Sequence, residues 1–136
     1  MKDMHNSIKV LRAVGPAAVG TTGASNGTLS GVIDRQGYES VEFVMSRGVS
    51  AAATDTITPV LLEADATNGS FTSVADADLL GTEADAVMLG NAATQSKLGY
   101  RGNKRYLKLR MYGVGTATAV VAGTAILGEP HLGPVA

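Results

Sequence analysis

The segment KRYLKLRMY, from Lys104 to Tyr112, constrains the fold of this chain more than any other. Leu107, Leu109 and Met111 alternate with polar or aromatic residues along it. A period of about two residues is typical of a β-strand with one buried face, whereas an amphipathic helix repeats every ~3.6 residues. The opposite face carries two tyrosines and two cations, although the chain of 136 residues contains only four Tyr, two Phe and no Trp. The segment therefore predicts a strand with a buried apolar face and an exposed face of unusual composition.

Extended segments separated by turn signals occupy most of the remaining chain. Asn68-Gly69 is typical of a tight turn between strands, and Arg35-Gln36-Gly37 indicates another turn. Pro59 lies within one apolar segment and predicts a sheet edge or a bulge there. The segments that we predict as strands are Leu29 to Ile33 with a bend near Gly31, Ser40 to Arg47, Ile57 to Ala64, Phe71 to Val74, Ala86 to Leu89 and Ala117 to Leu127, with a helical turn near Asp76 to Leu80.

Short strands and few helical patterns predict an all-β fold, either an antiparallel β-sandwich or a jelly-roll-like barrel. The length fits one domain that buries its own core. Residues 1–27 are rich in Gly, Ala, Ser and Thr, and we expect them to form an extended N-terminal arm. We expect the β-sandwich domain at residues 28–128. Residues 129–136 contain two prolines and should form an extended C-terminal tail.

A weak internal similarity relates two parts of the sequence. Gly37-Tyr38 and Gly99-Tyr100 each precede a strand, a glycine turn, a stretch of small residues and a second strand. Two hairpins of this kind could pack face to face as a sandwich. A chance likeness of two hairpins explains the pattern at least as well, so both explanations stay open.

No residue pattern predicts catalysis. The chain has no cysteine, which excludes disulfides and thiolate chemistry. His5 and His131 lie in opposite terminal segments, so a histidine-based triad is not indicated. The acidic run at residues 76–83 superficially resembles a calcium loop, but its glycine and Glu83 fall at the wrong offsets for an EF-hand. We therefore expect a non-enzymatic protein without catalytic residues, cofactor or metal.

The charges are segregated along the chain. The net charge of −1 predicts no general attraction to nucleic acid or membranes. The segment from Lys97 to Arg110 holds six cations and no acid, whereas the segment from Glu63 to Asp85 holds six acids and no cation. Cations interleaved with tyrosines fit a nucleic-acid surface, a protein interface or a solvated strand face. We place the nucleic-acid hypothesis below the other two, which we weigh equally.

As a protein interface, the basic segment would use the outer face of its strand. We also expect the N-terminal arm to lie on a neighbouring subunit. The basic segment of one copy could meet the acidic segment of another, and such a heterologous contact closes into rings such as trimers. The candidate interface residues are Tyr106, Lys108, Arg110 and Tyr112, with Lys104 and Arg105 beside them, and Ile8, Val10 and Leu11 in the arm.

No apolar run reaches the ~20 residues of a membrane-spanning helix. The segment from Ala117 to Leu127 comes closest and is too short. Asp3, Lys9 and Arg12 interrupt the apolar residues near the N-terminus, so we do not expect a signal peptide.

Four runs of the sequence resemble a group of small proteins of tailed bacteriophages and prophages, typically encoded in the structural module near the major capsid protein. The runs are VIDRQGYESVEFVM, DADLLGTE, LGYRGNKRYLKLR and AILGEPHLGPVA. The likeness covers most of the chain from about Gly31 onward, and the N-terminal segment is less distinctive.

This resemblance implies a virion structural protein, and more narrowly a head decoration (cement) protein that binds and stabilises the assembled lattice. It implies the major capsid protein and further copies of the chain, as a trimer, as partners, with no nucleic acid and no membrane. It also implies a location in the phage head after assembly in the cytoplasm of the host bacterium. A neck, head–tail joining or tail protein is an alternative, and a carbohydrate- or receptor-binding β module is another.

Overall fold

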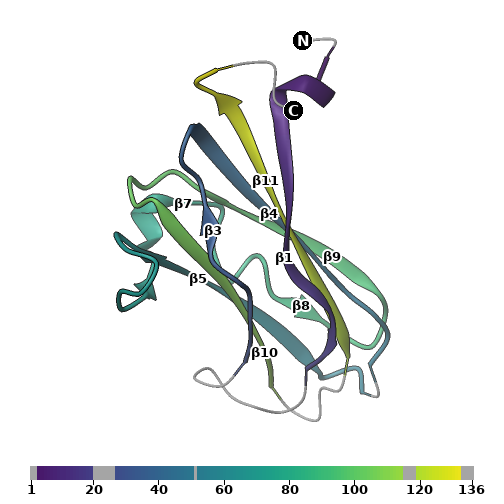
Figure 1. Ribbon diagram of the computed structural model, residues 1–136. Helices are drawn as coiled ribbons and strands as arrows, with labels where there is room; N and C mark the ends of the chain where they lie inside the picture. Colours follow the sequence, from purple (N-terminus) through teal and green to yellow (C-terminus); the bar gives the residue numbers. More distant parts are fainter. Residues whose placement is uncertain (1–2, 20–26, 51, 115–118, 133–136) are drawn as a thin grey trace.

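The computed structural model describes residues 3–19, 27–50, 52–114 and 119–132. Two antiparallel sheets face each other in the ribbon of Figure 1, which confirms the predicted all-β sandwich. Sheet A has the strand order β1-β11-β4-β9-β7, and its strands are β1 (Ile8–Ala18), β11 (Val120–Pro130), β4 (Tyr38–Arg47), β9 (Thr94–Tyr100) and β7 (Leu79–Leu80).

Sheet B has the order β2-β10-β5-β6, and two further short strands pair with its central members. Its strands are β2 (Thr28–Leu29), β10 (Tyr106–Val114), β5 (Thr56–Ala64) and β6 (Thr72–Ser73), with β3 (Ile33–Asp34) beside β10 and β8 (Met88–Leu89) beside β5. Two 3-10 helices, η1 (His5–Ser7) and η2 (Asp76–Asp78), are the only helical turns of the described residues. Within that part of the chain, no helix has the length and apolar character to cross a membrane.

The core lies between the two sheets and is filled by the alternate residues of the long strands. Phe43 and Met45 of β4 and Leu107, Leu109 and Met111 of β10 are fully buried. The period of two that the sequence shows along β10 is therefore the burial pattern of the strand. Small residues complete the core where the sheets approach closely: a Cβ at residue 123, a glycine of β11, would lie 2.9 Å from a methyl group of Leu109.

The internal similarity has a counterpart in the topology, although the two halves are not hairpins. β4 lies in sheet A and the next strand, β5, lies in sheet B; β10 lies in sheet B and the next strand, β11, lies in sheet A. Each half therefore crosses from one sheet to the other. The halves pair with each other instead, β4 with β11 and β5 with β10.

The N-terminal boundary of the sandwich differs from the predicted one. Ile8–Ala18 forms β1 and pairs along its length with β11 of the same chain, so the sandwich begins at Ile8 and not at residue 28. The register of β1 shifts between Arg12 and Val14 and again between Val14 and Ala17, and Pro16 lies in the strand. These irregularities hide the period of two that marks a strand.

The predicted C-terminal tail is shorter than expected, because β11 continues to Pro130. Residues 20–26 of the predicted arm and residues 133–136 of the predicted tail lie outside the described residues. A further strand, Thr94–Tyr100, was not predicted.

The bend predicted near Gly31 separates β2 from β3, and both pair with β10. Between them the Ser30 side chain replaces part of the strand ladder. The Leu109 N–H donates to the Ser30 hydroxyl at 2.9 Å, and the Ser30 N–H donates to the Leu109 carbonyl at 2.8 Å. The bend therefore leaves the buried part of β10 with its backbone hydrogen bonds satisfied.

Pro59 lies at a local edge within sheet B. On one side β5 pairs with β10 throughout, whereas on the other side β8 covers Thr56–Ile57 and β6 covers Leu62–Glu63. Pro59 falls in the gap between these two short partners, where no strand requires its missing N–H. The Leu61 N–H in the same gap donates to the carboxylate of Glu83 at 2.9 Å.

Candidate interaction surface on the outer face of sheet B

The four residues that the sequence singles out on β10 share the outer face of sheet B. Tyr106, Lys108, Arg110 and Tyr112 are half-buried, whereas the residues between them are in the core. Their exposed parts form a continuous stripe along the central strand of the sheet. We call this stripe, with the outward residues that flank it on β2, β3 and β5, the B face.

Flanking strands widen the B face with aliphatic side chains. Residues directly opposite each other on antiparallel strands share a face, so Leu29 and Val60 flank Arg110 on either side. Leu29 is 46% exposed. Polar and aliphatic groups side by side are typical of protein interfaces, in which tyrosine and arginine concentrate binding energy.

Lys108 packs over an aromatic ring. Its ammonium lies 4.2 Å from the centre of the Phe71 ring, within the range of a cation–π contact. Lys108 also pairs with Leu62, which is 3% exposed although it is not part of the main core. The middle of the B face therefore combines a small apolar cluster with a cation. Phe71 belongs to this surface, although no pattern in the sequence indicates it.

The two basic residues at the start of β10 are bound to acids of the same chain. Arg105 donates two hydrogen bonds to the carboxylate of Asp34, at 2.9 and 2.7 Å, and its guanidinium lies 4.9 Å from the centre of the Tyr106 ring. The hydrogen bond from Arg105 lowers the pKa of the Asp34 carboxyl. Lys104 forms an ion pair of 2.6 Å with Asp65, which raises the pKa of its ammonium.

The acidic and basic segments therefore meet inside one chain. Besides the ion pair of Lys104, Arg101 donates from Nε to the carbonyl of Ala77 at 2.7 Å and from its N–H to the carbonyl of Asp78. The separation of charge along the sequence predicts a contact between the acidic segment of one copy and the basic segment of another. β5 and β10 are neighbours in sheet B, so the two segments lie side by side without a second copy.

Tyr100 organises the loop that leads into β10. Its hydroxyl donates to the carboxylate of Glu63 at 2.6 Å and accepts from the Lys104 N–H at 2.9 Å. Burial, and then the Glu63 carboxylate, raise the pKa of this phenol. Gly102 has to be a glycine here, because a Cβ would lie 2.4 Å from the Tyr100 hydroxyl.

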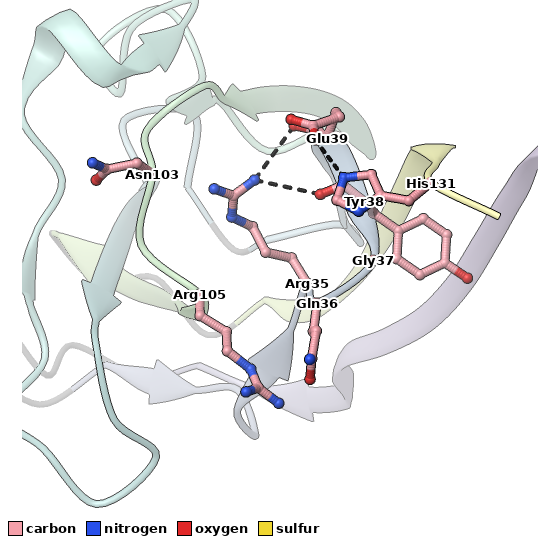
Figure 2. A pocket seen from close by; sticks show the side chains of 8 residues that line it. All are labelled: Arg35, Gln36, Gly37, Tyr38, Glu39, Asn103, Arg105 and His131. Carbon is pink, nitrogen blue, oxygen red and sulfur yellow. Dashed lines mark hydrogen bonds and ion pairs between the residues drawn. The ribbon is translucent and has the colours of Figure 1, made fainter.

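Arg35 connects the turn before β4 to the same loop by hydrogen bonds, and it lines the pocket shown in Figure 2. Its Nε donates to the carbonyl of Lys104 at 2.6 Å, and its Nη2 donates to the carbonyl of Gly102 at 2.8 Å. The pocket beside Arg35 has a volume of about 260 Å³, and the Glu39 carboxylate and the His131 ring, which both line it, are in direct contact. Arg35 and Arg105, the arginines that line the pocket, already donate hydrogen bonds to acceptors of the same chain. We therefore interpret the pocket as a place where two loops are held together, and not as a ligand site.

The described residues include the side-chain types that can bind metals and also the N-terminal interface candidates. Among them, no group of three or more His, Asp or Glu side chains is arranged to hold a metal ion. The N-terminal candidates separate: Ile8 and Val10 pair with outward residues of β11, whereas Leu11 lies opposite the buried Ala125 and packs against the core. Ile8 and Val10 belong to sheet A, on the side away from the B face.

No protein-family model and no curated protein matches the sequence. Solved structures do show similarity. A chain of the Clostridium thermocellum xylanase 10B with CBM22-1 and GH10 modules, complexed with xylohexaose, gives a TM-score of 0.56 at 12% identity over 96% of this chain. This chain spans only 28% of the length of that one. At this identity the likeness shows a shared sandwich fold.

Two further structures are similar at lower scores. The SPBc2 prophage-derived protein YomS gives a TM-score of 0.47 at 12% identity, with 90% of this chain and 95% of that chain covered. A chain of infectious bursal disease virus, Gx strain, gives a TM-score of 0.46 at 13% identity, with 88% of this chain and 31% of that chain covered.

Proposed function

We propose that the protein is a non-enzymatic structural protein of a tailed-phage virion that decorates the head by binding the assembled capsid lattice through the B face. The observation that carries the proposal is the stripe of Tyr106, Lys108, Arg110 and Tyr112 on an open sheet face. The four runs that resemble phage proteins of the capsid module support the same role. The major capsid protein is the proposed partner.

The protein would stabilise the capsid because its binding is coupled to the assembly equilibrium of the lattice. A protein that binds the assembled lattice and not its separate subunits stabilises the lattice by mass action. Each contact can be weak, because the symmetry of the lattice repeats it many times. The B face suits this role because its tyrosines, Lys108 and aliphatic residues lie on a rigid sheet and lose little conformational freedom on binding.

The decisive experiment measures the copy number of the chain in purified virions by quantitative mass spectrometry. A ratio near one per capsid subunit, or one per few subunits, is expected for a lattice-wide decoration protein. A ratio near one per hundred would move the protein to the neck or tail, and its absence from virions would overturn the proposal.

A variant tests the surface itself. Lys108→Glu reverses the charge over Phe71 and should reduce co-sedimentation with undecorated heads at least tenfold. Lys97→Glu makes the same change of charge on β9, on the outer face of the other sheet, and serves as the matched control. Equal loss in both variants, or no loss in Lys108→Glu, would show that the B face is not the lattice contact.

A second candidate is a carbohydrate-binding module. It is favoured by the fold shared with the chain that contains the CBM22-1 module and by the two tyrosines that line one open face, since aromatic rings can contact sugars. Glycan-array binding by the isolated protein, lost in Tyr106→Ala and Tyr112→Ala, would support this function. Absence of glycan binding together with a high copy number in virions would exclude it.

A further inference from the structure

The outer face of sheet A is a second open surface, on the opposite side of the sandwich from the B face. One row of residues crosses all five strands on this side: Val10, Ile126, Glu42, Gly99 and Leu80, each opposite the next. Val10 is 59% exposed and Leu80 is 51% exposed, at the two ends of the row. The row is therefore apolar apart from one carboxylate at its centre.

The next row carries the opposite charge. It consists of Arg12, Thr124, Val44 and Lys97, again opposite one another on β1, β11, β4 and β9. It contains two cations and no acid. Two neighbouring rows of the same sheet face thus have net charges of −1 and +2.

Glu42 is poorly satisfied within its own chain. Its Oε2 leans over Gly99, where a Cβ would lie only 2.6 Å away, and next to Leu80. Among the described residues its carboxylate accepts no hydrogen bond and makes no ion pair, although Lys97 lies near enough to act on it. Burial raises the pKa of Glu42, because a carboxylate among apolar side chains loses hydration.

We propose that this face binds a second copy of the chain, sheet A against sheet A, about a two-fold axis that crosses the strands between these two rows. The axis places the row of Glu42 on the row of Lys97 of the second copy. Each Lys97 then lies above Gly99 of the other copy, against the side chains of Glu42 and Leu80 that cover this glycine, and its ammonium faces the Glu42 carboxylate. The contact is isologous, so the same ion pair forms twice. This inference does not depend on the proposed function.

The pattern of charge favours a second copy over another partner. The carboxylate of Glu42 and the ammonium of Lys97 lie on neighbouring strands and in neighbouring rows, so a two-fold axis between the rows brings each one to its opposite charge on the other copy. Pairing through the edge of sheet A is disfavoured, because β1 carries Pro16, two register shifts and the cations Lys9 and Arg12. These features of the edge strand β1 do not obstruct the outer face of sheet A, which stays available for binding.

The expected affinity follows from the size of the face. The five strands of sheet A, about 4.8 Å apart, give a width of roughly 20 Å, and the seven residues of β9 give a length of roughly 25 Å. The face therefore covers about 500 Å² per copy. Two copies would bury about 1,000 Å², the lower limit for a specific interface. We therefore expect a dimer that dissociates in the micromolar range.

Sedimentation equilibrium of the full chain, from about 1 to about 500 μM, tests the proposal. The average mass should rise from that of one chain toward that of two. Glu42→Lys and Lys97→Glu should each weaken association at least tenfold, because each places like charges together. The double variant Glu42→Lys/Lys97→Glu exchanges the charges and should restore association to within about threefold of the wild type.

Two additional variants keep the test independent of folding. Leu80→Glu changes an exposed residue of the two-residue strand β7 and should also prevent dimerisation, with an unchanged circular dichroism spectrum. Lys108→Glu makes the Lys97→Glu change on the other sheet and should leave dimerisation unchanged. A wild-type chain that stays monomeric, associates as a trimer, or dimerises equally well in Leu80→Glu would overturn the proposal. A double variant no better than the single ones would do the same.

Discussion

Replacing Tyr100 by phenylalanine should destabilise the protein more than the same replacement at any other tyrosine of the described chain. The hydroxyl of Tyr100 makes two hydrogen bonds, one to the Glu63 carboxylate at 2.6 Å and one from the Lys104 N–H at 2.9 Å. Tyr100 is 1% exposed, so water does not replace the hydroxyl without a rearrangement of the loop. Tyr100→Phe removes only the hydroxyl oxygen with its proton. The Glu63 carboxylate and the Lys104 N–H then both lose their hydrogen bond to this residue.

The magnitude follows from the kind of bond that is lost. A hydrogen bond to a charged group contributes about 1.5–3 kcal/mol, and one between neutral groups contributes about 1 kcal/mol. Glu63 is half-buried and recovers part of this through water. We therefore expect a loss of about 2 kcal/mol, which corresponds to a fall in Tm of roughly 8 °C for a domain of this length.

Thermal and urea unfolding followed by circular dichroism measure the effect. Tyr106→Phe is the matched control, because the Tyr106 hydroxyl has no hydrogen bond among the described residues and its removal should change stability by less than about 0.5 kcal/mol. Equal stability losses in the two variants would refute the assignment of Tyr100 as the residue that holds the loop before β10.

The pH dependence gives a second readout. The pKa of Tyr100 is raised in the fold, so the folded chain keeps this proton while an unfolded tyrosine loses it above about pH 10. The unfolded state then binds fewer protons, and stability falls as the pH rises. Wild-type protein should lose more stability between about pH 9 and 11 than Tyr100→Phe, and parallel curves would contradict the raised pKa.

Three further changes test other parts of the structure. Gly102→Ala should cost about 2 kcal/mol in urea unfolding, because its Cβ would lie 2.4 Å from the Tyr100 hydroxyl, and a neutral result would mean that the loop adapts. Asp34→Asn should reduce the loss of stability on acidification: the pKa of Asp34 is lowered, so its contribution is present above about pH 4 and disappears as the pH falls through the lower folded value. Identical acid unfolding of both proteins would disprove this role. Glu42→Gln should leave the Tm of the monomer unchanged or raise it at pH 7, because burial disfavours the carboxylate, and a clear loss would show an unseen partner.

The parts of the fold that could be predicted are those in which one face of a strand is buried along its whole length. β10, β4 and β5 alternate in sequence because one side of each faces the core. β1 was placed in an arm because its register shifts break the alternation. β9 was missed because its first residues, Thr94 to Lys97, are mostly polar, and only Leu98 and Tyr100 are large and apolar.

The candidate surface was predicted only as far as one strand. The outward residues of β10 can be read from its period, but their neighbours come from distant segments. Arg105 and Asp34 are 71 residues apart, and Lys104 and Asp65 are 39 residues apart. Separation of charge along the sequence therefore did not show that the charges pair within the chain, since this depends on which strands are neighbours in the sheet.

The two proposed interfaces together make a final prediction. A dimer joined through sheet A presents its two B faces in opposite directions, so a flat lattice can contact only one of them. Above the dissociation constant, wild-type protein should therefore link undecorated heads into aggregates, because the second B face of each bound dimer can bind another head. Glu42→Lys should coat the heads without linking them, since it binds as a monomer. Dynamic light scattering distinguishes linked aggregates of heads from heads that are coated separately. Wild-type dimers that coat heads without linking them would show that the B face is not the lattice contact.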